Sequence, residues 1–183
     1  MKFENTELEG VKIITPDVYC DERGNFFEIF QAEKYREMGM KDNFVQDNQS
    51  FSKYRTIRGL HYQVGEYAQG KLIHIIQGKI LDVVVDVRFG SPTFGKYISI
   101  ELSDNDQKFI WIPAGFAHGF SVLSDTATVF YKCTAVYSPS HERGIIYNDQ
   151  TLSIDWKVVS PHVSEKDNNH PELSEIQKDY IYK

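Results

Sequence analysis

The strongest constraint on the fold is a stretch of two-residue alternation within Lys71–Arg88. Leucine and valine occupy the odd positions from 81 to 87, and Asp82 and Asp86 stand between them. A period of two is the repeat of a β-strand, whose successive side chains point to opposite faces. Gly78 and its neighbours form a turn before this strand, so the sequence predicts a β-hairpin over Lys71–Arg88.

Further short strands are predicted at regular intervals along the chain. They cover Val11–Tyr19, Phe26–Phe30, Lys96–Leu102, Phe109–Ile112, Gly119–Leu123 and Thr126–Tyr137. The 12 Phe and 11 Tyr favour pleated surfaces, and turn-forming Ser, Pro, Asp and Asn separate the strands. Short helices are predicted at Gln31–Met38, before Gly39, and at Glu172–Lys178. The fold class is therefore mainly β, a sandwich or jelly-roll barrel with a few short helices.

Length and charge limit the classes of protein to consider. A chain of 183 residues with 41% hydrophobic residues fits one domain over 1–183, and the polar tail from about residue 160 is expected to pack on the barrel. The net charge is −6 and no stretch gathers Lys and Arg, which argues against nucleic acid or an anionic membrane as partner.

The cysteines and the N-terminal residues indicate in which cellular compartment the protein is located. Cys20 and Cys133 lie far apart without CxxC spacing, which argues against a disulfide framework and a zinc site. The first residues carry acidic groups without an apolar run, and no eighteen apolar residues follow one another. We expect a soluble, cytoplasmic protein.

Three side chains that could carry chemistry fall in predicted strands. The period of two allows His61, Lys71 and Tyr131 to face the inside of a barrel. Taken singly, each has a more common explanation: a hydrogen-bonded core histidine, a lysine that reaches solvent from a strand end, and a core tyrosine. The residues alone leave both possibilities open.

Arg58–Gln63 and Pro113–Gly119 resemble the two halves of a cupin metal site without its ligands. A metal cupin has two histidines one residue apart and a glutamate shortly after, because a divalent ion needs three or four donors. Here Gln63 stands in place of the second histidine, and Glu66 is the one glutamate that follows closely. The sequence therefore predicts an acid/base pocket with no metal and no other cofactor.

Several short blocks occur in one order along the chain: Asp21–Gly24, Gln46–Ser50, Arg58–His61, Gln69–Leu72, Ser91–Thr93, Pro113–Gly119, Tyr131–Thr134, Tyr137–Pro139 and Ser164–Asp167. Together they resemble the dTDP-4-dehydrorhamnose 3,5-epimerases, cupin-like enzymes of dTDP-L-rhamnose synthesis that use no metal. The resemblance extends from about Val11 to Asp167.

The resemblance implies inversion of C3 and C5 of dTDP-4-dehydro-6-deoxy-D-glucose, which gives dTDP-4-dehydro-L-rhamnose. Proton abstraction beside a ketone needs a base, a stabiliser of the enolate oxygen and an acid. By resemblance, His61 is the base and Asp167 orients its ring. Tyr131 is the acid on the other face of the sugar, and Lys71 is the candidate stabiliser.

The resemblance also implies a nucleotide-sugar site and a homodimer. Arginine forks match phosphate oxygens, so Arg23 and Arg58 are the candidates for the diphosphate. The other expected substrate-binding residues are Glu28, Gln46, Asp47, Asn48, His118, Tyr137, Glu142 and Lys166. In the family, N-terminal strands contribute to the partner subunit.

Several alternatives remain open at this stage. The loop Val64–Ala68 departs from relatives, which often carry prolines there, so one carbon could be inverted rather than two. A 3,4-ketoisomerase on a 4-keto-6-deoxy sugar would use the same histidine. A sugar-binding jelly roll without catalysis and a metal cupin are the remaining candidates.

Overall fold

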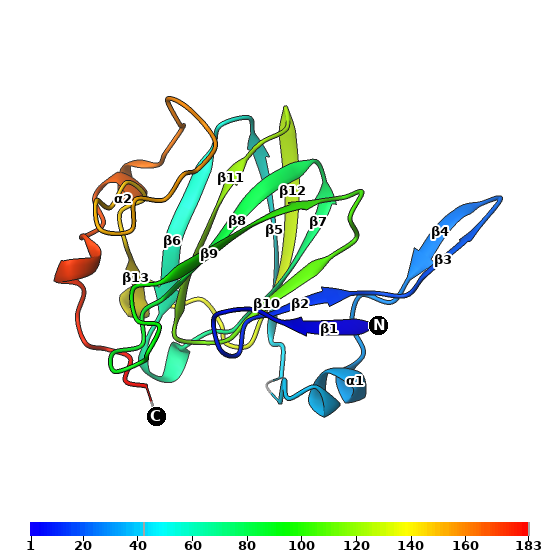
Figure 1. The fold of residues 1–183 in the computed structure, drawn as a ribbon, viewed down its shortest axis with the longest axis horizontal. Helices are drawn as coiled ribbons and strands as arrows, with labels where there is room; N and C mark the ends of the chain where they lie inside the picture. The colour runs from blue at the N-terminus through cyan, green and yellow to red at the C-terminus, as the bar shows by residue number, and fades with distance from the viewer. Residues whose placement is uncertain (42, 183) are drawn as a thin grey trace.

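Two β-sheets face each other and form the body of the molecule, and a thin two-stranded arm projects from it (Figure 1). This computed structural model describes residues 1–41 and 43–182. The six-stranded sheet has the order β1-β2-β10-β7-β12-β5 and the five-stranded sheet the order β13-β6-β11-β8-β9, with β3 and β4 in the arm. The predicted mainly β, jelly-roll architecture is confirmed.

Every strand pair is antiparallel. The six-stranded sheet contains β1 Lys2–Asn5, β2 Lys12–Thr15, β5 Gln46–Lys53, β7 Lys71–Gln77, β10 Phe109–Ile112 and β12 Thr126–Cys133. The five-stranded sheet contains β6 Ile57–Gln63, β8 Lys79–Asp86, β9 Tyr97–Ser103, β11 Phe116–Val122 and β13 Glu142–Gly144. The arm comprises β3 Val18–Asp21 and β4 Gly24–Phe27, and the helices are α1 Ala32–Glu37 and α2 Glu165–Asn168. Short 3₁₀ helices cover Gly65–Tyr67, Pro139–His141 and Leu173–Glu175.

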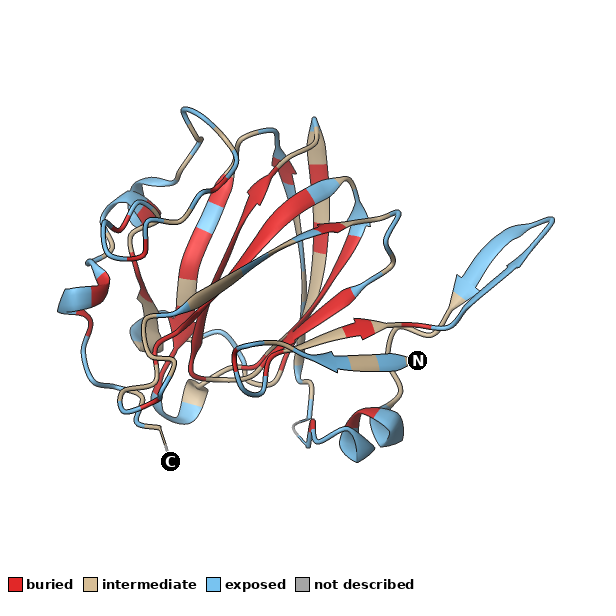
Figure 2. Cartoon of the chain, viewed as in Figure 1, coloured by how far each residue is buried: buried red, intermediate tan, exposed pale blue. Residues whose placement is uncertain are grey.

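Buried apolar residues form three layers around the two sheets. Figure 2 shows the buried positions along the strands of both sheets. The first layer lies between the sheets, where Ile80 and Val84 of β8 meet Ile73 of β7. The odd-numbered leucine and valines of β8 point the other way and pack under the C-terminal segment, whose buried Leu173 and Ile176 complete the second layer. Both faces of β8 are thus covered, and its aspartates are enclosed rather than solvated.

The third layer lies on the outer face of the six-stranded sheet. Helix α1 places the buried Tyr35 against Phe109 of β10, and Met40 joins them. Gln31 caps this helix, because its side-chain oxygen accepts a hydrogen bond from the backbone N–H of Lys34 at 2.6 Å.

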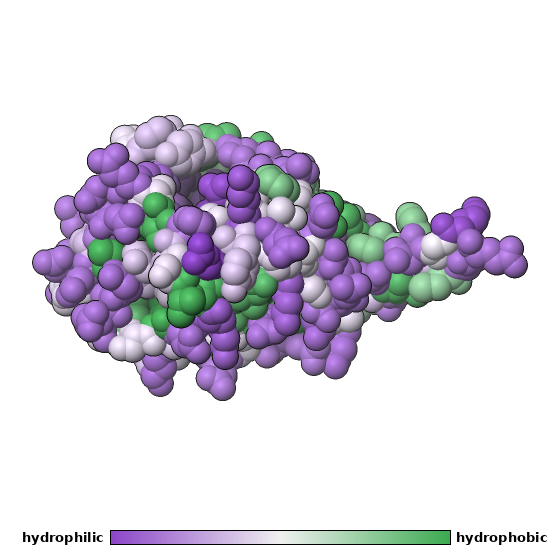
Figure 3. Space-filling view, turned by 90° about the horizontal axis from the view of Figure 1, so that it is seen from above, coloured by the Kyte–Doolittle hydropathy of each residue, from purple (hydrophilic) through white to green (hydrophobic). Residues whose placement is uncertain are grey.

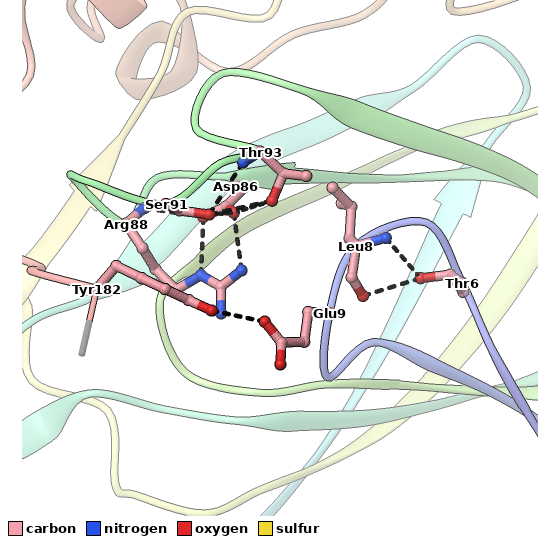
Figure 4. A network of polar contacts seen from close by, with 8 residues as sticks. All are labelled: Thr6, Leu8, Glu9, Asp86, Arg88, Ser91, Thr93 and Tyr182. Atoms are coloured by element: carbon pink, nitrogen blue, oxygen red, sulfur yellow. Dashed lines mark hydrogen bonds and ion pairs between the residues drawn. The ribbon is translucent and has the colours of Figure 1, made fainter.

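The buried carboxylate of Asp86 joins the end of β8 to both ends of the chain (Figure 4). It accepts hydrogen bonds from Ser91 Oγ and Thr93 Oγ1, both at 2.6 Å, and from the guanidinium of Arg88. Burial raises the pKa of Asp86, but these donors outweigh burial and the net pKa is lowered. The Arg88 guanidinium also lies over the ring of Tyr182, whose hydroxyl donates to Glu9 at 2.7 Å.

The helix predicted at Glu172–Lys178 is wrong. A single 3₁₀ turn forms there, at Leu173–Glu175, and Ile176 is extended. Because Leu173 and Ile176 both insert into the second layer, docking on the barrel decides the path of this segment. None of the helices that the structure describes has the length and apolar composition needed to cross a membrane.

Most of the other predicted elements are present, but they begin or end at different residues than predicted. The predicted strand Val11–Tyr19 divides into β2 and β3 around Pro16, since proline lacks the N–H that a strand ladder needs. The predicted strand Thr126–Tyr137 ends at Cys133. The hairpin predicted over Lys71–Arg88 is wrong, although both of its strands form. Strand β7 pairs with β10 and β12 in the six-stranded sheet, and β8 pairs with β11 and β9 in the five-stranded sheet. Gly78, at φ +86°, lies in the turn that takes the chain from one sheet to the other. A period of two predicts a strand but not its partner.

Candidate active site

A cavity of about 720 Å³ opens between the two sheets. Its lining includes nine of the predicted site residues: Arg58, His61, Lys71, His118, Tyr131, Tyr137, Glu142, Lys166 and Asp167. They come from strands of both sheets, from α2 and, for Tyr137, from the segment after β12, so segments far apart in the sequence meet at one cavity.

His61 and Asp167 form a hydrogen-bonded pair on the wall made by the five-stranded sheet. His61 Nε2 lies 2.7 Å from Asp167 Oδ1, and the backbone N–H of Gly59 donates to Asp167 Oδ2 at 3.1 Å. The helix α2 fixes the carboxylate, because its cap Ser164 accepts a hydrogen bond from the N–H of Asp167. Burial raises the pKa of Asp167, but the hydrogen bond from His61 and its charge outweigh burial and lower the pKa to about 2. The carboxylate is therefore ionised and can stabilise an imidazolium.

Tyr131 and Lys71 lie on the opposite wall, in β12 and β7 of the six-stranded sheet. The strands pair so that Tyr131 stands opposite Ile73 and Cys133 stands opposite Lys71. Burial raises the pKa of the Tyr131 phenol, as does the nearby Cys133, so the phenol carries its proton at neutral pH. A protonated phenol thus faces the cavity across from an imidazole.

Lys71 places an enclosed amino group in the wall of the cavity. Burial lowers the pKa of its ammonium and outweighs the nearby Cys133, Glu142 and Asp82, which raise it, so the net pKa is lowered. Among residues 1–41 and 43–182, the Lys71 side chain makes no hydrogen bond or ion pair, while its backbone belongs to the ladders of β7 with β10 and β12. Its Nζ is therefore placed to donate to an oxygen that becomes negative in this cavity.

Glu142 of β13 organises another part of the cavity. Its Oε2 accepts hydrogen bonds from Tyr137 at 2.8 Å and from Lys166 Nζ at 2.6 Å. Burial raises the pKa of Glu142, but the Lys166 and Tyr137 hydrogen bonds and the charge of His61 outweigh burial and lower it. The ion pair between Glu142 and Lys166 also joins β13 to α2, the helix that carries Asp167.

His118 forms a second histidine–aspartate pair deeper in the five-stranded sheet. Its Nε2 lies 2.8 Å from Asp82 Oδ2, and His118 stands opposite His61 in the β11–β6 ladder. Asp82 Oδ1 is buried without a hydrogen-bond partner in the described part of the chain. This aspartate accounts for one polar position in the alternation of β8, a role that sequence reasoning missed.

Arg58 lies at the exposed edge of β6. Its Nε donates to Ser52 Oγ at 2.9 Å, and one of its terminal nitrogens donates to the carbonyl of Phe51. These contacts hold the guanidinium beside the cavity and leave further N–H groups for an anionic ligand.

The remaining predicted site residues do not line the cavity of this chain. Gln46 and Asn48 lie close by on the inward face of β5, where Gln46 Oε1 accepts from the N–H of Tyr137 at 2.8 Å. Asp47 points to the other face of β5 and pairs with Lys132 at 2.7 Å.

Arg23 and Glu28 belong to the arm and the segment that follows it. Arg23 stands between β3 and β4 and pairs with the neighbouring Asp21 at 2.5 Å. Glu28 forms an ion pair with Lys34 of α1 at 2.7 Å. Neither residue lines the cavity of its own chain.

Gln63, which replaces the second cupin histidine, has a structural role. It is buried, and its Nε2 donates to the carbonyls of Tyr67 and Val136 while its Oε1 accepts from the N–H of Ser138. Among the described residues, the group whose donor atoms could hold a metal is instead His61, Asp167 and His170, with these atoms within 4.8 Å of one another. Sequence reasoning missed His170, because it lies after the end of α2 and nothing in the sequence shows that it is enclosed beside Asp167.

Comparison with known proteins extends the resemblance drawn from the sequence blocks. The model of the family described as dTDP-4-dehydrorhamnose 3,5-epimerase matches residues 5–175. A dTDP-4-dehydrorhamnose 3,5-epimerase of Shigella flexneri is 48% identical over 182 residues, which cover 99% of each chain.

Two solved structures show how far the fold is shared. A dTDP-6-deoxy-D-glucose-3,5-epimerase from Legionella pneumophila Philadelphia 1, in complex with dTDP-4-keto-L-rhamnose, superposes with a TM-score of 0.95 at 45% identity and covers 100% of this chain and 98% of its own. A 3'-monoepimerase from Streptomyces bikiniensis, in complex with dTDP-quinovose, gives a TM-score of 0.87 at 32% identity and covers 92% and 86%. The predicted cupin-like fold and the predicted resemblance are both confirmed.

Proposed function

Because the chain belongs to the dTDP-4-dehydrorhamnose 3,5-epimerase family, we propose that its cavity inverts C3 and C5 of dTDP-4-dehydro-6-deoxy-D-glucose to give dTDP-4-dehydro-L-rhamnose. One observation carries the proposal: a histidine–carboxylate pair and a protonated phenol lie on facing sheets of a single cavity. Inversion of a carbon requires removal of a proton from one face and return of a proton to the other.

His61 removes the proton beside the C4 ketone. Its Nε2–H donates to Asp167, which leaves the lone pair of Nδ1 for the substrate. The imidazolium that forms is stabilised by the ionised carboxylate at 2.7 Å. The C–H electron pair moves to the C4 oxygen and forms an enolate.

Lys71 and Tyr131 complete each half-reaction from the opposite wall. The ammonium of Lys71 stabilises the enolate oxygen, an effect of about 3 kcal/mol for a preorganised donor in an enclosed site. Tyr131 then donates its proton to the other face of the same carbon. C3 and C5 both flank the ketone, so one constellation can act on both when the sugar ring turns between the two events.

A single-site epimerase remains the second candidate, because the Streptomyces bikiniensis monoepimerase shares the fold at 32% identity. The loop that departs from relatives at Val64–Ala68 contains the 3₁₀ helix Gly65–Tyr67 and contacts Gln63 through the carbonyl of Tyr67. A difference in this loop can change the room for ring rotation.

The enzyme acts as a homodimer in which each arm reaches the partner's cavity, as the family resemblance implies. The arm extends away from the body of its own chain and exposes Val18, Tyr19 and Phe26, which a partner surface would cover (Figure 1). Arg23 and Glu28 then bind substrate in the neighbouring cavity, and Arg58 binds it from the same chain. Both cysteines are free thiols, which supports a cytoplasmic location.

Incubation with dTDP-4-dehydro-6-deoxy-D-glucose in deuterated water tests the activity. The double epimerase incorporates deuterium at C3 and at C5, and the product has the L-rhamno configuration. Deuterium at one carbon alone identifies a single-site epimerase. A shifted carbonyl identifies a ketoisomerase, and no incorporation with retained binding identifies a sugar-binding module.

A further inference from the structure

A second imidazole stands on the other side of the carboxylate that orients the proposed base. His170 Nε2 lies 3.7 Å from Asp167 Oδ1, the same oxygen that His61 contacts at 2.7 Å. The two imidazole rings meet edge to face, with their centroids 5.4 Å apart. The proposed mechanism gives His170 no role.

The position of the His170 ring is fixed by packing rather than by hydrogen bonds. Its Nε2 is buried and has no hydrogen-bond partner in the described part of the chain. The ring packs on the backbone of β13 at Gly144, where a Cβ atom would come within 2.4 Å of Nε2. Since an unpartnered buried nitrogen loses the hydrogen bond it would make in water, this arrangement leaves a donor atom ready for a ligand.

Two imidazoles and one carboxylate form a donor set that suits zinc and related borderline metals. Bonds of about 2.0–2.2 Å to a tetrahedral ion place neighbouring donors roughly 3.3 Å apart. The present separations of 2.7 and 3.7 Å lie on either side of that value, so small movements of the side chains would complete the set. The fourth position would open to the cavity that His61 and Asp167 line.

We propose that His61, Asp167 and His170 form an inhibitory site for a divalent transition-metal ion, with Zn²⁺ as the best match. The ion bonds to Nε2 of His61 in place of the proton, and that proton moves to Nδ1. Nδ1 is the atom that accepts the substrate proton in the proposed function, so the metal-bound histidine cannot act as a base. Catalysis itself remains independent of metal.

Titration of the chelator-treated enzyme with ZnCl₂ in a calorimeter tests binding without any substrate. We expect one ion per chain. His170→Gln and His61→Gln should each weaken binding by about tenfold or more, because each removes one of three ligands. His141→Gln is the matched control: His141 is bonded to Ser138 and belongs to no metal-ligand group of the described residues, so the variant should bind as the parent does.

Inhibition is then measured on the parent and on His170→Gln, each relative to its own rate without metal. The proposal predicts that zinc inhibits the parent at the concentration at which it binds, and that His170→Gln needs about tenfold more. Equal zinc affinity in the parent and in His170→Gln, with both proteins equally folded by thermal melting, would overturn the proposal.

The proposed function and the proposed metal site can be contradicted independently of each other. A parent protein that binds zinc through His170 but exchanges no deuterium would contradict the function and support the metal site. An active epimerase that zinc neither binds nor inhibits would contradict the metal site alone.

Discussion

At the residue scale, the chemistry depends on the different roles of His61 and Tyr131. Replacement of His61 by Ala removes the base, so both proton exchange and inversion should be lost. Replacement of Tyr131 by Phe keeps the base but removes the acid. Inversion should then fall by about 10²–10³-fold while exchange at the same carbon falls much less. Proton NMR in deuterated water measures both rates, and an equal loss of both in Tyr131→Phe would contradict separate base and acid.

Asp167 also makes the stability of the fold depend on pH. Its pKa is about 2 in the folded protein against the ordinary value of 3.8. Because the folded-state pKa is the lower one, the carboxylate stabilises the fold by about 2 kcal/mol above pH 4, and this stabilisation is lost as the pH falls toward 2. Urea unfolding of the parent and of Asp167→Asn should therefore show a stability difference that shrinks by about 1 kcal/mol between pH 6 and pH 3.

Asp155 provides the control for this pH dependence. It is exposed and pairs with Lys157 at 3.6 Å, in a geometry that contributes little to stability. Asp155→Asn should show the same pH profile as the parent. A constant difference between the parent and Asp167→Asn across this pH range would show that the folded state does not hold Asp167 at a low pKa.

The sequence identified the residues around the keto-sugar better than it identified their supports. His61, Lys71 and Tyr131 are visible because they fall at strand positions inside recognisable blocks, and all three line the cavity. Asp82 and His170 were missed, since a buried aspartate in an alternating strand and a histidine after a short helix look like solvated groups. Only the enclosing layers of the fold show that they are buried.

At the scale of elements, the site depends on a close approach between β6 and β11. Gly59 has φ +111°, and a Cβ atom there would lie 2.6 Å from Gly119 Cα and 2.6 Å from the carbonyl oxygen of His118. The same residue donates its N–H to Asp167. Any side chain at position 59 must therefore push apart the strands that carry His61 and His118, the histidines of the two histidine–aspartate pairs.

Gly59→Ala should destabilise the protein by about 2–4 kcal/mol, as expected for backbone strain combined with overpacking. Activity should also fall by about tenfold or more in the protein that remains folded, because the carboxylate shifts. Gly90→Ala separates the two effects: Gly90 has φ +88° with nothing within 4 Å of a Cβ, so its cost should be about 1 kcal/mol with activity unchanged. Chemical denaturation and initial rates measure both, and equal losses in the two variants would contradict the close approach.

Whether the sequence predicts a strand depends on what the two faces of that strand contact. Strand β8 was predictable because Leu81, Val83 and Val85 repeat with a period of two, but its partners were not, since that period does not show that β7 and β8 lie in different sheets. Strand β5 was not predicted, since Gln46, Asn48, Ser50 and Ser52 face the sheet interior in place of apolar residues. Those polar side chains lie near the cavity. They stand where the apolar residues of an alternating strand pattern would be, so the sequence does not predict this strand.

At the scale of the whole molecule, the arm is the feature that the single chain leaves unexplained. It projects from the body with exposed apolar side chains, as Figure 3 shows, and Tyr19 and Phe26 are 66% and 70% exposed. A two-stranded hairpin alone is marginally stable, which supports the proposal that a surface on another chain covers the arm. The proposed dimer provides that surface and brings Arg23 to the neighbouring diphosphate.

Exchange of subunits between two inactive variants tests this arrangement. Arg23→Ala should lower kcat/KM by about 10–100-fold through the loss of a charge-assisted hydrogen bond to phosphate. In a mixed dimer with His61→Ala, the body of the Arg23→Ala chain keeps its histidine and receives an intact arm from its partner. One complete site forms per mixed dimer, so an equimolar mixture should recover about a quarter of parental activity.

The matched control combines His61→Ala with Tyr131→Phe, whose changes both lie in the body of the chain. No mixed dimer of this pair contains a complete site, so its activity should stay at the level of the separate variants. If the Arg23→Ala mixture also stays at that level although mass spectrometry shows that subunits have exchanged, Arg23 acts within its own chain or not at all. Recovery in the first mixture and not in the second requires that the arm crosses between subunits, because no other arrangement joins an intact Arg23 to an intact His61.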